Sequence, residues 1–320
     1  MACFPGSTRR VHDRFLNISL TTDDNAADSL PHMPDNPSMP ARLPALTERP
    51  VYPAMRRMRR AVLRRLGRWS RGAYDVRLVY DQGQPLYKKV VFNSDRQARR
   101  VASALSAFGE SIHVPTLRHQ ADNAIWVDYV AGHAFDPHAA DQLEGVAECF
   151  TCFALRPSRA VALGEAGLAE ESRQRLDWLL DNAVIAPRLA NTLAARIEAY
   201  DAGLVLRFGF DYADPIAANL LTRADTGQIC AIDVKNVRQD ALVGLGVAKA
   251  HARWLDDDGL RRILSDWQSQ GLADVVAAFD FIRLYERIER VARQAVTEKR
   301  SRGAIRKQNN KADKLEALLD

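Results

Sequence analysis

The chain has 320 residues, of which 47% are hydrophobic and 27% charged. That composition supports a sizeable buried core in one large or two small domains, and it excludes a disordered, collagen-like or small disulfide-linked protein. No apolar run approaches the roughly 20 residues of a transmembrane helix, the N-terminal sequence lacks the apolar core of a secretory signal, and only four cysteines are present. We therefore expect a cytoplasmic protein with free thiols.

The positive charge of the chain is concentrated in one segment. The formal net charge is +5, but residues 54–71 contain eight arginines and no acidic residue, so the rest of the chain carries a net charge of −3. A nucleic-acid-binding protein more often carries its basic surface on the folded body. A basic nucleic-acid-binding protein is therefore the weakest of the functional alternatives.

The first two segments are predicted to be a disordered region and a basic helix. Residues 1–50 hold seven of the 14 prolines, which is typical of disorder. Residues 54–71 are predicted to form an amphipathic helix, because apolar residues recur there at spacings of three and four. Its apolar stripe consists of Met55, Met58, Val62, Leu66 and Trp69. Such a helix can bind an anionic membrane from the inner face, contact nucleic acid, or stay solvated or docked on its own protein.

Residues 73–132 are predicted to form a small β-rich lobe that contains one helix. Runs of β-branched and aromatic residues flank two turn sequences, DQGQP and ADN, which is typical of β-hairpins. The expected elements are strands at 73–80 and 86–92, a helix at 94–108 capped by Ser94 or Asp95, and a second hairpin at 116–130 that ends at Gly132.

Residues 133–296 are predicted to form a larger helical lobe with an inserted hairpin. The expected elements are helices within 137–200 and 246–296, a buried strand at 204–210 and a hairpin at 220–234, followed by a basic tail at 297–320. This order predicts an α+β fold with a cleft between a small β-rich lobe and a larger helical lobe.

Three features in this order point to phosphoryl transfer. A lysine, Lys88 or its neighbour Lys89, lies in a strand; Asp214 and Asn219 lie five residues apart after an apolar strand; and Asp233 ends the later hairpin. Phosphoryl transfer needs a cation on the nucleotide phosphates, a carboxylate near the acceptor hydroxyl, and oxygen ligands for magnesium. Lys88 is the preferred lysine, because its alternate positions in the strand are apolar and it shares their face.

In these residues the chain resembles the protein-kinase-like superfamily. The nearest branches are the aminoglycoside and choline phosphotransferases and the bacterial lipopolysaccharide-core sugar kinases. The family's catalytic loop, His-Arg/Gly-Asp, four residues and Asn, is matched by Tyr212-Ala213-Asp214 and Asn219. The family's metal-binding Asp is matched by Asp233 in an Ala-Ile-Asp-Val sequence, and its hinge by residues 126–132. The resemblance covers about residues 73–260.

The resemblance implies a bilobal protein-kinase-like fold and a phosphotransferase that uses ATP and Mg²⁺. It implies Asp214 as the base, Lys88 or Lys89 on the phosphates, Asn219 and Asp233 as metal ligands, and the hinge residues Asp128, Tyr129 and Val130 around the adenine. The segment 234–245 is short, which favours a small-molecule or glycolipid hydroxyl over a protein acceptor. We expect a sugar or lipid-linked sugar, such as a lipopolysaccharide-core component.

The chain also departs from the family pattern. No glycine-rich loop precedes Lys88, the helix at 94–108 contains no glutamate to pair with it, and Tyr212 stands in place of the loop histidine. Asp211 is a rival for the base, although its spacing from Asn219 is less suitable. These departures keep open a second interpretation, a pseudokinase that binds nucleotide and serves as a platform for a partner.

Overall fold

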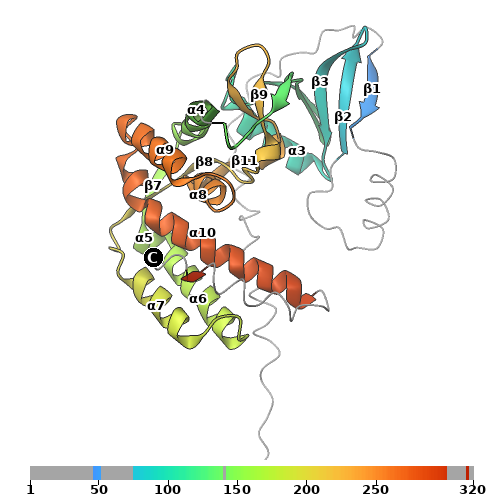
Figure 1. The fold of residues 1–320 in the computed structure, drawn as a ribbon. Coiled ribbons are helices and arrows are strands. Elements are labelled where there is room, and N and C mark those ends of the chain that lie inside the picture. Colours follow the sequence, from blue (N-terminus) through green and yellow to red (C-terminus); the bar gives the residue numbers. More distant parts are fainter. Residues whose placement is uncertain (1–45, 52–74, 140–141, 301–314, 317–320) are drawn as a thin grey trace, which may run out of the picture. The chain divides into compact units, whose positions relative to one another are not determined.

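The computed structural model describes residues 46–51, 75–139, 142–300 and 315–316 (Figure 1). The predicted basic helix at 54–71 and most of the predicted disordered segment at 1–50 lie outside these residues. Within the described part, none of the helices is both long and apolar enough to cross a membrane.

An antiparallel five-stranded sheet forms the N-terminal lobe, with the strand order β1-β2-β3-β5-β4. Its elements are β1 (Thr47–Pro50), β2 (Asp75–Asp81), β3 (Gln84–Val91), β4 (Leu117–Ala121) and β5 (Ala124–Asp128), with helix α3 (Asp95–Ser106) between β3 and β4. Both predicted hairpins are confirmed, and their turns place Gln82, Gly83 and Asp122 at positive φ. Ser94 caps α3 by accepting a hydrogen bond from the backbone N–H of Gln97.

Strand β1 corrects the predicted end of the disordered segment. Residues 47–50 pair with β2 over four register positions, and the Glu48 carboxylate forms ion pairs with Arg77 and Lys89 of the neighbouring strands at 2.9 and 2.8 Å. The strand has the sequence TERP, which carries no apolar alternation, and all four of its residues are exposed. Pairing with β2 supplies the order that local sequence does not indicate.

The C-terminal lobe is mainly helical and carries two small antiparallel sheets, with the orders β10-β9-β6 and β11-β8-β7. Its helices are α4 (Gln142–Ala154), α5 (Leu163–Ala166), α6 (Leu168–Asp181), α7 (Pro187–Glu198), α8 (Leu245–His251), α9 (Asp257–Ser269) and α10 (Ala273–Arg300). Its strands are β6 (Gly132–Ala134), β7 (Arg159–Ala162), β8 (Val205–Tyr212), β9 (Leu220–Arg223), β10 (Ile229–Ala231) and β11 (Val237–Leu242). The predicted strand at 204–210, the hairpin at 220–234 and the helices at 246–296 are confirmed.

Gly132 does not end the second hairpin but begins β6. A Cβ atom at this position would lie 2.1 Å from the backbone oxygen of Thr222, because β6 pairs closely with β9. Only glycine allows this approach of two backbones. The chain therefore passes from the N-terminal sheet directly into a strand of the C-terminal lobe.

Two apolar clusters hold the described residues together. The larger one runs from β3 and α3 through α4 and β8 to α8, α9 and the first half of α10, and the smaller one lies between α6, α7 and the second half of α10. Figure 1 shows α10 as the long helix that runs beside α8 of the larger cluster and α6 of the smaller one. Because α10 continues to Arg300, the predicted tail boundary at 297 is wrong, and Leu315 beyond it is buried in the smaller cluster.

Candidate active site

A cavity of about 620 Å³ lies where the N-terminal sheet meets the loops of the C-terminal lobe. Its volume is in the range of sites that hold a ligand of nucleotide size. Its walls come from three sources: β2 and β3, the segment after β5, and the loops that follow β8 and β10. Among its lining residues are Val51, Val76, Lys88, Asp128, Tyr129, Val130, Asp214, Asn219, Ile232, Asp233 and Lys235. Seven predicted site residues, spread over 146 positions of the chain, thus border one space.

Lys88 and Lys89 lie on opposite faces of β3. Lys88 borders the cavity, and its Nζ donates to the backbone oxygen of Ile232 at 2.7 Å. Lys89 forms an ion pair with Glu48 and lies over the ring of Trp126 at 4.7 Å from the centroid. The strand alternation that favoured Lys88 matches this arrangement, and of the two lysines Lys88 alone lines the cavity.

The Lys88 ammonium is surrounded by protein, and this burial lowers the pKa of Lys88. The carboxylate of Asp233 opposes the shift, because it favours the charged lysine. Helix α3 supplies no acidic partner, and Glu110, just beyond it, is paired with Arg118 at 3.0 Å. The carbonyl of Ile232, immediately before Asp233, is the hydrogen-bond acceptor that holds the Lys88 side chain.

The predicted hinge residues lie along the cavity, and the side chain of Asp128 is already engaged. The Asp128 carboxylate accepts hydrogen bonds from Arg118 Nε and Nη2 at 2.8 and 2.7 Å. The backbone N–H groups of Asp128 and Tyr129 donate to Thr116 and Leu86 at 3.0 and 3.1 Å, which fixes the course of the chain into Val130. A base bound here would therefore meet the backbone of this segment and not a free carboxylate.

Tyr212 ties the predicted catalytic loop to Asp233. At the end of β8, its buried hydroxyl donates to the backbone oxygen of Asn219 at 3.3 Å and accepts from the backbone N–H of Asp233 at 3.2 Å. Burial raises the pKa of Tyr212 well above its ordinary value, so the hydroxyl keeps the proton that it donates. The residue at the loop histidine position thus joins the two loops.

Asn219 and Asp233 offer oxygen atoms that suit a divalent cation. Asn219 Nδ2 donates to the backbone oxygen of Asp214 at 2.9 Å, which leaves Oδ1 as the free acceptor end of the amide. The Asp233 carboxylate accepts from Asn236 Nδ2 at 3.0 Å and pairs with Lys235 Nζ at 3.1 Å. The described residues contain no group of three or more His, Cys, Asp or Glu that could hold a metal. One amide oxygen and one carboxylate fit Mg²⁺, which usually takes its other ligands from phosphates and water.

Asp211 does not belong to the cavity. Its carboxylate is buried and accepts a hydrogen bond from the backbone N–H of Gly246 at 2.8 Å. Burial raises the pKa of Asp211 to about 7, while Lys249 and the backbone donors around the carboxylate oppose this shift. Of the two acids considered as the base, Asp214 borders the cavity and Asp211 does not.

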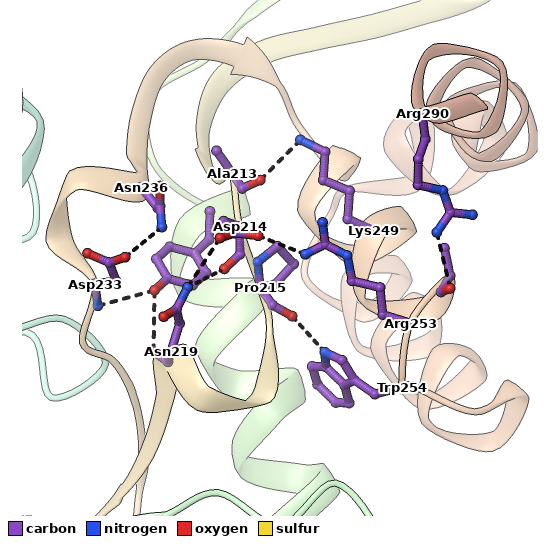
Figure 2. Close-up of polar contacts among 12 residues, drawn as sticks. Ala213, Asp214, Pro215, Asn219, Asp233, Asn236, Lys249, Arg253, Trp254 and Arg290 are labelled. Atoms are coloured by element: carbon purple, nitrogen blue, oxygen red, sulfur yellow. Dashed lines mark hydrogen bonds and ion pairs between the residues drawn. The ribbon is translucent and has the colours of Figure 1, made fainter. Parts of the chain in front are cut away.

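Residues at and just beyond the end of α8 contact the predicted catalytic loop in ways that the sequence does not indicate (Figure 2). Lys249 Nζ donates to the oxygen of Ala213 at 3.1 Å, and the indole N–H of Trp254 donates to the oxygen of Pro215 at 2.6 Å. Between them, Arg253 Nη1 pairs with Asp214 Oδ1 at 2.7 Å. Nothing in the spacing of these residues relates them to a loop some 35 to 40 positions earlier, so only the fold could reveal them.

Comparisons with known proteins agree with this architecture. No family model matches the chain, and no curated protein sequence matches it. Among solved structures, the chain is similar to a macrolide 2'-phosphotransferase type I, with a TM-score of 0.52 and 13% identity over 84% of this chain and 97% of that one. It is also similar to an ethanolamine kinase from Plasmodium vivax, with a TM-score of 0.50 and 7% identity over 85% of this chain and 82% of that one.

These similarities and the order of the elements show the class of fold. The chain has a protein-kinase-like α+β fold, with a small β-rich N-terminal lobe and a larger helical C-terminal lobe, as the sequence predicts. The fold alone does not define the reaction, which must be argued from the residues of the site.

Proposed function

We propose that the protein is a phosphotransferase that moves the γ-phosphoryl group of ATP to a hydroxyl of a small molecule. The observation that carries this proposal is the convergence of Lys88, Asp214, Asn219 and Asp233 on one cavity of nucleotide size. A cation, a carboxylate and two oxygen ligands are the groups that phosphoryl transfer requires. The similar structures are named as a phosphotransferase and a kinase, which supports the same chemistry.

The proposed roles follow from what each side chain can do. Lys88 donates to the nucleotide phosphates, and the backbone of residues 128–130 contacts the base. Asn219 and Asp233 hold Mg²⁺, which when bound neutralises the phosphate charge. Asp214 accepts the proton of the acceptor hydroxyl while the hydroxyl oxygen bonds to the γ-phosphorus. The bond from the γ-phosphorus to the oxygen that bridges the β- and γ-phosphates breaks, and ADP leaves.

We propose that the molecule whose hydroxyl is phosphorylated is a sugar or a lipid-linked sugar. The segment between Asp233 and α8 is taken up by β11, a strand paired with β8, and this compact arrangement favours a small acceptor. The arginine-rich segment 54–71 lies in the chain between β1 and β2, and Val51 at the end of β1 borders the cavity. We therefore propose that this segment brings the cavity close to an anionic membrane on its cytoplasmic face, where lipid-linked acceptors are found.

Nucleotide binding is tested first, with a matched pair of lysine variants. Isothermal titration calorimetry with the non-hydrolysable analogue AMP-PNP is expected to show magnesium-dependent binding. Lys88→Met should weaken this binding about tenfold or more, since a charge-assisted hydrogen bond is lost. Lys89→Met, one position along on the other face of β3, should leave the affinity within about twofold. An equal loss of affinity in both variants, or no AMP-PNP binding either with or without Mg²⁺, would contradict the proposed site.

Transfer is tested with Asp214→Asn and Asp233→Asn in an assay of ADP formation over a panel of sugars. Asp214→Asn should abolish transfer but keep nucleotide affinity, whereas Asp233→Asn should remove the magnesium dependence of binding. The alternative, a nucleotide-binding pseudokinase, is supported by the absence of an acidic partner for Lys88 on α3. It predicts nucleotide binding that is indifferent to magnesium and to Asp233→Asn, with no ADP formed.

A further inference from the structure

The contact between Arg253 and Asp214 differs in kind from its two neighbours. Lys249 and Trp254 reach backbone oxygens of the loop, so they position the chain. Arg253 reaches the carboxylate that borders the cavity (Figure 2). Because Asp214 is the proposed base, Arg253 lies beside the group that would receive the acceptor hydroxyl, and its charge acts directly on that carboxylate.

The Arg253 guanidinium keeps most of its donors available. Arg253 lies two residues beyond the end of α8, and its side chain is 35% exposed, next to the 42% exposed side chain of Asp214. A guanidinium has five N–H groups in a planar fork. In the part of the chain that the structure describes, the Asp214 carboxylate is the only group that accepts a hydrogen bond from the Arg253 guanidinium. The remaining donors can therefore address a second, external anion.

Further cations stand behind Arg253. Arg290 of α10 donates through Nη1 to the oxygen of Ala252 at 3.2 Å, while its buried Nη2 lacks a hydrogen-bond partner among the described residues. Arg287, one turn earlier, is half-buried, and burial together with the charge of Arg290 lowers the pKa of Arg287. Glu286, which pairs with Arg290 at 3.5 Å, offsets part of this charge. Arg290 thus contacts the residue that precedes Arg253, while Arg253 itself supplies the positive charge directly beside Asp214.

We propose that Arg253 is a specificity-determining residue that selects an acceptor carrying a phosphate or carboxylate beside its reactive hydroxyl. The planar fork of arginine suits such a group, which it can bind through two parallel hydrogen bonds. An anionic acceptor would occupy the free donors of Arg253 and bring its hydroxyl to Asp214. An acceptor with an ammonium group would meet repulsion from Arg253. This inference rests on the proposed phosphotransferase function and narrows its acceptor class.

The test compares matched probes in the presence of Mg²⁺ and AMP-PNP, which occupy the nucleotide site. Glucose 6-phosphate and glucuronate are the anionic probes, glucose is neutral, glucosamine is cationic, and a water-soluble short-chain phosphatidylinositol represents a lipid source of the same phosphate chemistry. Calorimetry is expected to show that at least one anionic probe binds about tenfold or more tightly than glucose, and that glucosamine binds more weakly. The soluble and lipid arms then show which source the site accepts.

Variants separate a role in recognition from a role in folding. Arg253→Gln should abolish the preference for the anionic probe, and Arg253→Lys should retain part of it, because charge is kept but the fork is lost. Arg261→Gln is the matched control: this arginine of α9 is 76% exposed and pairs with Asp258, so the preference should persist. Equal affinity for anionic and neutral probes, no binding of any anionic probe, or a preference that survives in Arg253→Gln overturns the proposal.

The same samples distinguish this proposal from the proposed function. ADP formation measured with ATP on all probes reports transfer itself. Transfer without any preference for anionic acceptors leaves the phosphotransferase standing and removes the role of Arg253. Anion binding that depends on Arg253, without any ADP formation, keeps the role of Arg253 in anion recognition and contradicts the proposed phosphotransferase.

Discussion

Asp211 and Asp214 are three residues apart and experience opposite environments. Asp211 lies in β8, is buried against the start of α8 and accepts a hydrogen bond from the N–H of Gly246. Asp214 borders the cavity and is paired with the half-exposed Arg253. Sequence spacing could rank the two acids but could not establish which one is accessible. Burial favours Asp214 as the proposed base, because a carboxylate enclosed by protein cannot reach an acceptor hydroxyl.

The buried Asp211 predicts a specific pH dependence of stability. Its pKa is raised from 3.8 to about 7 in the folded protein, so the folded state binds this proton more tightly than the unfolded chain does. The free energy of unfolding should therefore increase as the pH falls from about 7 towards 4, by up to about 4 kcal/mol from this group. Above pH 7 the contribution should be constant.

Urea denaturation of the wild type and of Asp211→Asn between pH 5 and pH 8 measures this effect. The asparagine keeps the side-chain oxygen but cannot titrate, so the difference in unfolding free energy between the two proteins should shift in favour of the wild type at the lower pH. Two proteins whose stabilities run parallel across this range would show that Asp211 is already charged in the folded state at pH 5.

At the scale of elements, strands with strong apolar patterns could be predicted and short polar ones could not. The strand β8 and the hairpins β2–β3, β4–β5 and β9–β10 follow from runs of β-branched and aromatic residues between turn sequences. The strands β7 and β11 have the sequences RAVA and VRQDAL, which carry no alternation of apolar and polar residues. Both pair with β8, so they owe their conformation to a partner strand that is distant in the sequence.

The junction of β8 and α8 requires a glycine at position 246. A Cβ atom there would lie 2.6 Å from the backbone oxygen of Tyr212 and 3.0 Å from the Asp211 carboxylate. Gly246→Ala should therefore push α8 away from the end of β8 and lower the unfolding free energy by about 1–3 kcal/mol. Because α8 carries Lys249 and leads directly into Arg253 and Trp254, which contact residues 213–215, nucleotide-dependent transfer should fall as well.

Gly164→Ala serves as the control for this substitution, because the added Cβ would lie 3.4 Å from its nearest neighbour, the Cβ of Ala202. Alanine also favours a helix over glycine, so this variant should be as stable as the wild type or slightly more stable. Thermal denaturation of both variants makes the comparison. A Gly246→Ala protein as stable as Gly164→Ala would mean that α8 can shift at little cost.

At the scale of the whole molecule, the site could be predicted in its parts but not in its assembly. The sequence placed Lys88, Asp214, Asn219 and Asp233 on the correct kinds of element, because each follows or lies within a recognisable strand. It could not show that the Lys88 ammonium is held by the carbonyl of Ile232, since that contact joins residues 144 positions apart. Contacts of this kind depend on how the two lobes pack, and local patterns carry no information about them.

A ligand that fills the cavity should stabilise both lobes at once, because the cavity wall is shared between them. Hydrogen exchange with AMP-PNP and Mg²⁺ is expected to slow in β3 of the N-terminal sheet and, in the same experiment, in residues 214–221 and 232–236 of the C-terminal lobe. Lys88→Met should reduce the protection on both sides, since Lys88 Nζ bonds across to the oxygen of Ile232. Lys89→Met should leave the pattern unchanged. Protection confined to one lobe would mean that the nucleotide does not bridge the cavity, and the roles assigned to Lys88 and Asp233 could not both hold.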